Sequence, residues 1–211
     1  MRLAVVAVAL VAASPAAAQK SFLAPLDASG DIETWIALGP DGAEHPDADL
    51  ARAALATWVA ASAGTIRIKF VKQRANARLR LIWVGAAGSQ YGEMRPIRVG
   101  KRRGAEVFVR PVTGGLGPRI ARRAKRDRLY RDAIVFLTCV HELGHGFGLG
   151  HTAAFADIMY SFQHGGDIER YFGRYRDRLR RRTDVRRVSP LSPADIAALR
   201  ALYQRPRPTP K

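Results

Sequence analysis

Three histidines stand at a spacing that can build a metal site. Residues 141 to 151 read His-Glu-Leu-Gly-His-Gly-Phe-Gly-Leu-Gly-His, which is the pattern H-E-x-x-H-x-x-G-x-x-H. On an α-helix, His141 and His145 lie one turn apart on the same face, so both imidazoles can bind one metal ion. Gly148 can end the helix, because glycine accepts the positive φ of a sharp turn. The chain would then return with His151 as a third nitrogen ligand.

The number of ligands indicates what such a metal would do. Three protein ligands leave a fourth position open for water, which is typical of a catalytic Zn²⁺, whereas a structural zinc has four protein ligands. The metal lowers the pKa of its water to about 7 and polarises a carbonyl group. Glu142 can reach that water and accept its proton as a general base. The motif therefore predicts a hydrolytic zinc site with ligands His141, His145 and His151 and with Glu142 as the catalytic residue.

The extended motif resembles that of the metzincin metallopeptidases, and its surroundings resemble the matrixins, the group of the matrix metalloproteinase catalytic domains. Residues 157–160, Asp-Ile-Met-Tyr, are similar to the metzincin methionine turn, which makes Met159 a packing floor beneath the zinc and not a ligand. Thr152 matches the Ser or Thr that matrixins carry after the third histidine. Residues 191–203 resemble the last matrixin helix. The specific resemblance covers about the C-terminal third of the chain.

The resemblance implies one zincin-like domain of the α+β class. Its expected parts are a twisted, mostly parallel sheet, an active-site helix and a C-terminal helix. The implied activity is that of a zinc-dependent metalloendopeptidase acting on protein or peptide substrates. His45 is the only histidine before the motif, so a second, structural zinc is not supported, and acidic residues are too sparse to assign calcium. Cys139 lies about 200° around the helix from His141, so we expect a small buried residue and not a switch or ligand.

Two other functions are compatible with the same motif. The first is a zinc amidase that hydrolyses a non-protein amide, such as a cell-wall peptide. The second is an inactive zincin-like module that adheres through its basic surface, although the intact Glu142 argues against it. Substrates decide between the first alternative and an endopeptidase, because the motif is the same in both.

The N-terminus has the features of a signal peptide. Arg2 precedes an apolar run over residues 3–13, and residues 16–18 are three alanines that fit an A-x-A cleavage site. We therefore expect residues 1–18 to be removed and residues 19–211 to form the exported domain of a bacterial-type enzyme, periplasmic or extracellular. No later apolar stretch reaches the roughly 20 residues of a transmembrane helix. One cysteine allows no intramolecular disulfide, so packing and metal binding must stabilise the domain.

Apolar periodicity and turn residues predict the order of the elements. Strands are expected at residues 31–38, 65–71, 77–84, 95–99 and 105–110, and helices at 47–63 and 129–147 and from 192 onward. The strand at 95–99 is our candidate for an edge that binds an extended substrate. For the last helix, Ser192 fits the N-cap, Pro193 the first helical position and Asp195 the closing residue of a capping box. We expect this helix to support the underside of the metal site.

The chain is strongly basic, with a formal net charge of +17. Residues 119–131 hold seven basic residues and one acidic residue, and residues 170–187 hold nine and two. The second cluster lies at about residues 167–187, between the methionine turn and the last helix. This segment is longer than in the matrixins, and we call it the insert. Apolar residues recur through this insert at a helical spacing, which predicts an amphipathic helix with an arginine-rich face. These apolar positions are Ile168, Tyr171, Phe172, Tyr175 and Leu179.

Three interpretations of the insert remain open. It is a solvated surface, it adheres to an anionic envelope polymer or lipid surface, or it selects acidic substrates near the cleft. Nucleic-acid binding is not expected, because export argues against it and no nucleic-acid-binding fold is evident. We expect the protein to be a monomer.

Overall fold

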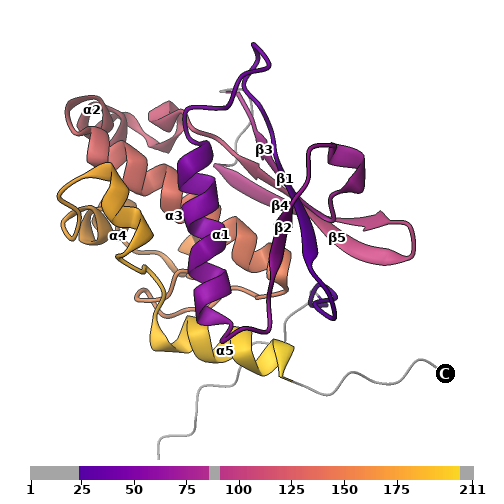
Figure 1. Ribbon diagram of the computed structural model, residues 1–211. Helices are drawn as coiled ribbons and strands as arrows, with labels where there is room; N and C mark the ends of the chain where they lie inside the picture. The colour runs from indigo at the N-terminus through magenta and orange to yellow at the C-terminus, as the bar shows by residue number, and fades with distance from the viewer. Residues whose placement is uncertain (1–23, 86–90, 205–211) are drawn as a thin grey trace, which may run out of the picture.

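The computed structural model describes residues 24–85 and 91–204 as a mixed α+β domain (Figure 1). The signal peptide predicted for residues 1–18 lies outside this part of the chain. The strands are β1 (Ile32–Ile36), β2 (Ile68–Phe70), β3 (Leu79–Trp83), β4 (Gly92–Val99) and β5 (Arg102–Val109). The helices are α1 (Ala48–Ala61), α2 (Pro118–Arg126), α3 (Arg128–Phe147), α4 (Ile168–Arg176) and α5 (Pro193–Tyr203). Short 3₁₀ turns η1 (Arg74–Asn76), η2 (Thr113–Leu116), η3 (Phe162–His164) and η4 (Arg182–Arg186) join them.

The five strands form one sheet in the order β2-β1-β3-β5-β4. β1 pairs in parallel with β2 and β3, and β3 pairs in parallel with β5. β4 runs antiparallel to β5 and lies at an edge of the sheet. This arrangement confirms the predicted α+β class with a mostly parallel sheet. It also confirms that residues 95–99 belong to an edge strand, which begins earlier, at Gly92.

The core lies between the sheet and the two long helices, α1 and α3 (Figure 1). Along β5 the side chains of Ala105, Val107 and Val109 are fully buried at every second position, as expected for a strand with one covered face. Trp58 of α1 is also fully buried, and its indole N–H donates to the carbonyl oxygen of Val140 on α3 at 2.8 Å. This bond fixes α1 against the helix that carries the histidine motif.

Most predicted elements form, but several have different bounds. The strand expected at 65–71 pairs only over β2, because Ile66 donates its N–H to the hydroxyl of Ser62, at the end of α1, and not to a strand. Helix α2 was not predicted, because only Ile120 and Ala124 are apolar positions that it buries among basic residues. In α5 the capping box of Ser192 and Asp195 forms as predicted.

The amphipathic helix predicted for the insert is shorter than its apolar spacing suggested. α4 ends at Arg176, and the apolar position Leu179 is buried in the turn that follows the helix. Among the described residues, no helix combines the length and the apolar character that crossing a lipid bilayer requires.

Candidate metal centre

Helix α3 and the turn after it position the three histidines. His141 and His145 lie on the last two turns of α3, and Gly148 follows the helix with φ 104° and ψ 9°. The N–H of Gly148 bonds to the carbonyl oxygen of His145 at 2.9 Å, and that of Leu149 bonds to the carbonyl of Gly144 at 2.9 Å. A side chain at position 148 would be strained by this left-handed backbone. The turn reverses the chain immediately before His151.

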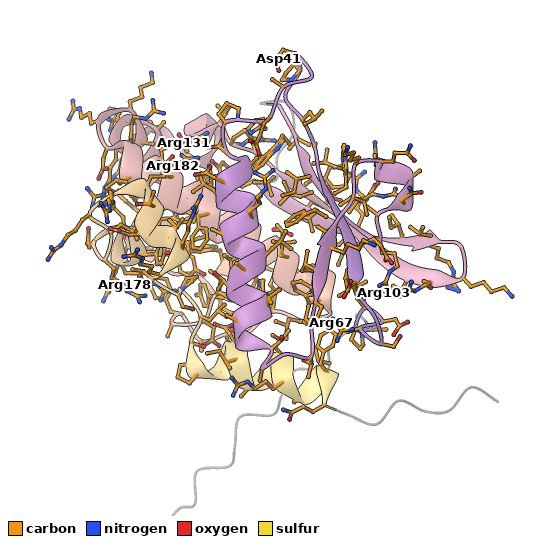
Figure 2. All side chains as sticks on the ribbon, viewed as in Figure 1. Asp41, Arg67, Arg103, Arg131, Arg178 and Arg182 are labelled. Carbon is orange, nitrogen blue, oxygen red and sulfur yellow. The ribbon has the colours of Figure 1, made fainter. Side chains whose placement is uncertain are left out.

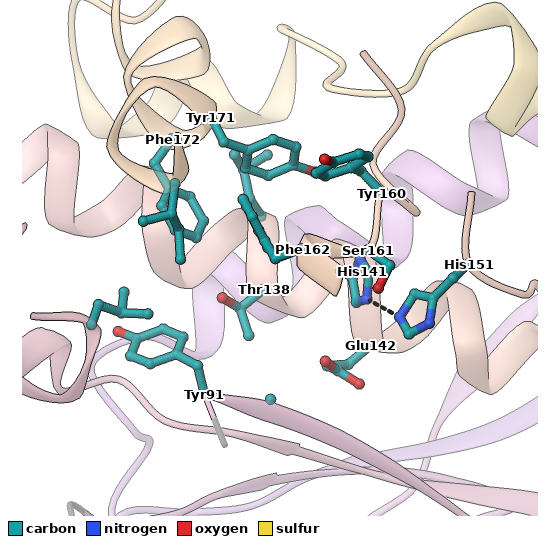
Figure 3. Close-up of a pocket in the computed structure, with 14 residues that line it drawn as sticks. Tyr91, Thr138, His141, Glu142, His151, Tyr160, Ser161, Phe162, Tyr171 and Phe172 are labelled. Carbon is teal, nitrogen blue, oxygen red and sulfur yellow. Dashed lines mark hydrogen bonds between the residues drawn. The ribbon is translucent and has the colours of Figure 1, made fainter. Parts of the chain in front are cut away.

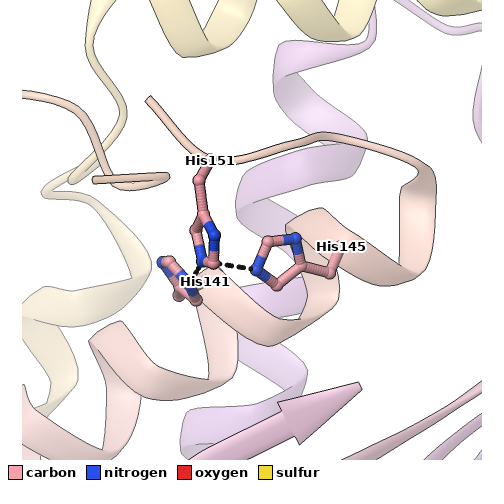
Figure 4. Close-up of side chains that lie close together, drawn as sticks. All are labelled: His141, His145 and His151. Carbon is pink, nitrogen blue, oxygen red and sulfur yellow. Dashed lines mark hydrogen bonds between the residues drawn. The ribbon is translucent and has the colours of Figure 1, made fainter. Parts of the chain in front are cut away.

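The three imidazoles converge on one point (Figure 4). The Nε2 atom of His151 lies 3.3 Å from Nε2 of His141 and 3.1 Å from Nε2 of His145. Ligands at about 2.1 Å from a tetrahedral zinc are about 3.4 Å from one another, so the observed spacing suits an ion held between the three rings. All three candidate ligand atoms lie within 4.8 Å of one another. The predicted ligands are therefore together and could hold a metal ion.

Hydrogen bonds orient two of the rings. Nδ1–H of His141 donates to the carbonyl oxygen of Ile158 at 2.7 Å, and Nδ1–H of His145 donates to that of Leu149 at 2.8 Å. These bonds place the proton on Nδ1 and leave the Nε2 lone pair free for a metal. Burial lowers the pKa of His141 to about 3 and the pKa of His145 to about 4. Both rings are therefore neutral near pH 7, which is the form that binds metals.

The segment around Met159 supports the site from below. Met159 is buried, and a Cβ at Gly144 of α3 would collide with its sulfur. The backbone of Met159 accepts a bond from the N–H of Thr152 at 2.8 Å, and Ser161 donates to the carbonyl of Thr152 at 3.0 Å. These contacts join the loop after His151 to the Met159 segment. They therefore fix the position of His151 relative to Met159.

Helix α5 fixes that segment through Asp195. Its buried carboxylate accepts the N–H groups of Ile158 at 2.9 Å, Met159 at 3.4 Å and Ser192 at 2.8 Å. Burial raises the pKa of Asp195 despite these bonds. Tyr171 of α4 adds a donor, because its hydroxyl lies 3.1 Å from the carbonyl oxygen of Ile158. The carbonyl that orients His141 is thus held by α4 and α5, as expected for a C-terminal helix that braces the site.

Beside the histidines lies a cavity of about 270 Å³ (Figure 3). Its lining is largely aromatic and aliphatic and includes Tyr91, Leu116, Leu137, Tyr160, Phe162, Ile168, Tyr171 and Phe172. His141, His151 and Glu142 line the same cavity. In Figure 3 Tyr91 lies on the left and Glu142 lies right of centre, with the Tyr91 hydroxyl directed away from the carboxylate.

Glu142 is the buried acid of the cavity, with only 7% of its surface exposed. Burial, helped by the negative charge of Glu93, raises the pKa of Glu142 to about 8. The carboxylate also lies against the start of β4, because a Cβ at Gly92 would be 2.5 Å from its Oε1. A side chain at position 92 would therefore displace the side chain of Glu142 or that of Thr138.

Sequence reasoning identified the three histidines that converge here but missed several residues that position them. Gly92 fell outside the predicted strand, and Tyr171 was assigned only to an apolar stripe. Asp195 was recognised from its capping box, which reveals one of its roles but not its bonds to the backbone of Ile158. These contacts join segments that lie far apart in the sequence, so no local pattern signals them. Cys139 is fully buried, as predicted, and burial raises the pKa of its thiol.

Comparison with protein-family profiles and with curated protein sequences found no match to this chain.

Proposed function

We propose that this protein is an exported zinc-dependent metalloendopeptidase. The observation that carries the proposal is the convergence of three imidazole nitrogens beside the buried carboxylate of Glu142, which lines the same cavity as His141 and His151. Neutral imidazoles suit zinc, and a set of three leaves room for a water and a substrate oxygen. The resemblance of the motif to metzincins supports the same activity.

The chemistry divides between the metal and the chain. A zinc ion at the triad would activate a water molecule and polarise the scissile carbonyl. Glu142 would accept the proton of that water and return it to the leaving amine. Burial raises the pKa of Glu142 to about 8, and a cation held at the triad would lower it again. Near neutral pH a carboxyl group poised in this way can both accept and release a proton.

The edge strand β4 is the proposed docking site for the substrate backbone. It begins at Gly92, against Glu142, and only one of its sides is paired within the sheet. An extended peptide can add to such an edge through backbone hydrogen bonds. Pro96 lacks an N–H group, which limits pairing farther along the strand. Recognition through the backbone would make cleavage tolerant of most side chains.

The aromatic-lined cavity is the proposed site for one substrate side chain. It is lined by residues of α3 and α4 and by Gly92 at the start of β4, and Glu142 is part of this lining. Its apolar lining favours a large apolar side chain, because burial gains about 25 cal/mol per Å² of apolar surface. We therefore expect cleavage next to such residues.

A peptide-library digest tests the proposal. The mature protein, loaded with zinc, is incubated with mixed peptides, with and without a chelator, and the products are identified by mass spectrometry. We expect internal cleavage beside large apolar residues, loss of cleavage with chelator and recovery on addition of zinc. Cleavage of cell-wall amides but no peptides would instead indicate an amidase. Zinc binding without any hydrolysis would favour the inactive module.

A further inference from the structure

Two segments carry most of the positive charge of the chain. Residues 118–131 and 167–187 together hold sixteen basic and five acidic residues, which gives +11 of the total +17. Ion pairs join the segments side by side. Glu169 of α4 pairs with Arg119 of α2 at 3.1 Å, and Arg176 of α4 pairs with Asp127 at 2.6 Å. The two basic clusters of the sequence therefore form one surface at one end of the molecule (Figure 1).

Each of the five acidic residues of these segments already forms an ion pair or a hydrogen bond. Glu169 and Asp127 form the ion pairs between α2 and α4, and Asp177 lies 3.9 Å from Arg123. Asp167 caps α4, and Asp184 accepts the N–H groups of Arg180 and Arg181. No acidic residue of the two segments is left to neutralise further cations.

Eight basic side chains of the two segments remain exposed without a side-chain hydrogen bond or ion pair to any described residue, and two of these, Arg186 and Arg187, lie at the end of η4. We call the other six the α2–α4 basic face: Arg122, Lys125, Arg126, Arg128, Arg170 and Arg180. Arg122, Lys125 and Arg126 lie on α2. They project from the side opposite its buried residues, Ile120 and Ala124. Arg180 is close to the junction of α2 and α3, since Arg176 bonds both Asp127 there and the carbonyl of Leu179.

Folding accounts for only part of this face: Lys125 and Arg126 lie in the last turn of α2, where the helix dipole favours cations, but two other arrangements oppose folding. Arg122 and Arg126 are four residues apart on α2, an arrangement of like charges that destabilises a helix by about 0.2–0.5 kcal/mol. Arg128 lies in the first turn of α3, where the helix dipole disfavours a cation. Neither α2 nor α3 has an acidic residue in its first turn. An anion bound from outside would relieve these repulsions.

We propose that the α2–α4 basic face binds a linear polymer that carries a phosphate in each repeat. Fifteen of the sixteen basic residues in the two segments are arginines, and the guanidinium fork binds phosphate oxygens in pairs. Cations distributed over three helices and a turn suit a flexible chain with repeated charges. A bilayer is a poorer partner. The large apolar side chains exposed among the described residues are Leu38, Phe70, Val112 and Phe162, and none lies on this face.

This face adjoins the candidate metal centre. α4 carries Arg170 on its outer side, while its Ile168 and Phe172 line the cavity beside Glu142. A polymer bound to the outer side of α4 would therefore keep the cavity beside Glu142 close to substrates attached to the same polymer. The binding itself does not depend on the proposed hydrolysis, so each can fail without the other.

Binding to inorganic polyphosphate tests the proposal. Affinity is measured for the wild-type mature protein over a range of salt concentrations, and for a variant with Arg122, Arg126, Arg128 and Arg180 changed to Gln. A matched variant changes Lys69, Lys72, Arg98 and Lys101 to Gln, which removes the same charge from exposed positions near the sheet. Thermal unfolding and zinc content establish that both variants are folded.

We expect the first variant to lose at least tenfold in affinity and the matched variant to lose less than threefold. The slope of log affinity against log salt should fall by about 0.7 for each phosphate contact removed. Equal losses in both variants would show a non-specific effect of net charge and overturn the proposal. So would equal affinity for a polyglutamate of the same charge, or binding to phosphatidylglycerol vesicles in preference to polyphosphate.

Discussion

At the scale of single residues, the site is organised by backbone groups. The carbonyl oxygens of Ile158 and Leu149 orient His141 and His145, so the chain sets both rings before any metal binds. The convergence of His141 and His145 could be predicted from sequence, because helical spacing places them on one face, and Gly148 indicated the turn that returns His151. The contact of Gly92 with the carboxylate could not be predicted, because it depends on how the sheet edge meets the helix.

Replacing the proposed base should separate metal binding from hydrolysis. Glu142→Gln should keep zinc at the wild-type stoichiometry but lose peptide hydrolysis by about 100-fold or more, the usual contribution of a general base. His145→Ala should lose both zinc and activity, because a ligand is removed. Zinc content by atomic absorption and initial rates on casein provide the measurements. A Glu142→Gln variant that cleaves casein at the wild-type rate would refute the assignment of the base.

Adding one methyl group at Gly92 should disturb the base without touching the ligands. The new Cβ would lie 2.5 Å from Oε1 of Glu142, so the carboxylate must move. We expect Gly92→Ala to lower kcat at least tenfold while zinc affinity stays unchanged. Gly30→Ala is the matched control, because its Cβ would meet nothing within 4 Å. Unchanged kcat in Gly92→Ala would mean that the position of the carboxylate is not critical.

At the scale of elements, the helices form largely where their patterns predict them. α3 begins one residue before its predicted start, and α5 begins at the capping box that its sequence indicates. The predictions were less accurate for elements whose bounds are set by contacts with other parts of the fold. The start of β2 depends on Ser62, and α2 buries only two side chains. Such elements are held by tertiary contacts, which a single sequence does not reveal.

The brace from α5 gives a prediction that distinguishes a positioning role from a capping role. Asp195→Ala removes the acceptor for Ile158 and Met159 and should destabilise the fold by about 2–3 kcal/mol. Because Ile158 orients His141, zinc affinity should also fall about tenfold. Asp167→Ala, the control, removes the cap of α4 and should cost about 1 kcal/mol without changing zinc affinity. Chemical denaturation and competition with a zinc indicator measure the two quantities, and equal zinc affinity in both variants would exclude the positioning role.

At the scale of the whole molecule, a network of charges fastens the insert to the core. Arg182 of η4 pairs with Asp49 at 2.6 Å, Asp132 at 2.6 Å and Asp47 at 3.2 Å, and Arg131 of α3 also pairs with Asp47 (Figure 2). Asp47 and Asp132 are buried. Arg182 is therefore not part of an arginine-rich surface, although its neighbours in sequence are exposed. Sequence could not assign this role, because Asp47 and Arg182 are 135 positions apart.

This network predicts how stability depends on pH. Burial opposes the charge of Asp47, but hydrogen bonds from Arg131 and Arg182 outweigh it and hold the pKa of Asp47 below its usual value. The pKa of Asp49 is lowered by Arg182 in the same way, against the effect of burial. A carboxyl group whose pKa is lowered by folding contributes stability above its unfolded pKa, about 3.9, and loses that contribution as pH falls through the folded pKa.

Arg182→Gln should therefore destabilise the protein most near neutral pH. We expect the free energy of unfolding to fall by about 2–3 kcal/mol at pH 7. The loss is smaller than for a buried carboxylate left with no ion pair, because Arg131 still pairs with Asp47. The difference from wild type should stay constant down to about pH 5 and shrink below about pH 4, as the carboxyl groups become protonated. Arg67→Gln, which breaks an exposed pair with Asp31, should cost less than about 0.5 kcal/mol at any pH. Urea unfolding between pH 3 and pH 8 measures these differences. A loss that does not depend on pH would show that Arg182 acts through packing and not through its charge.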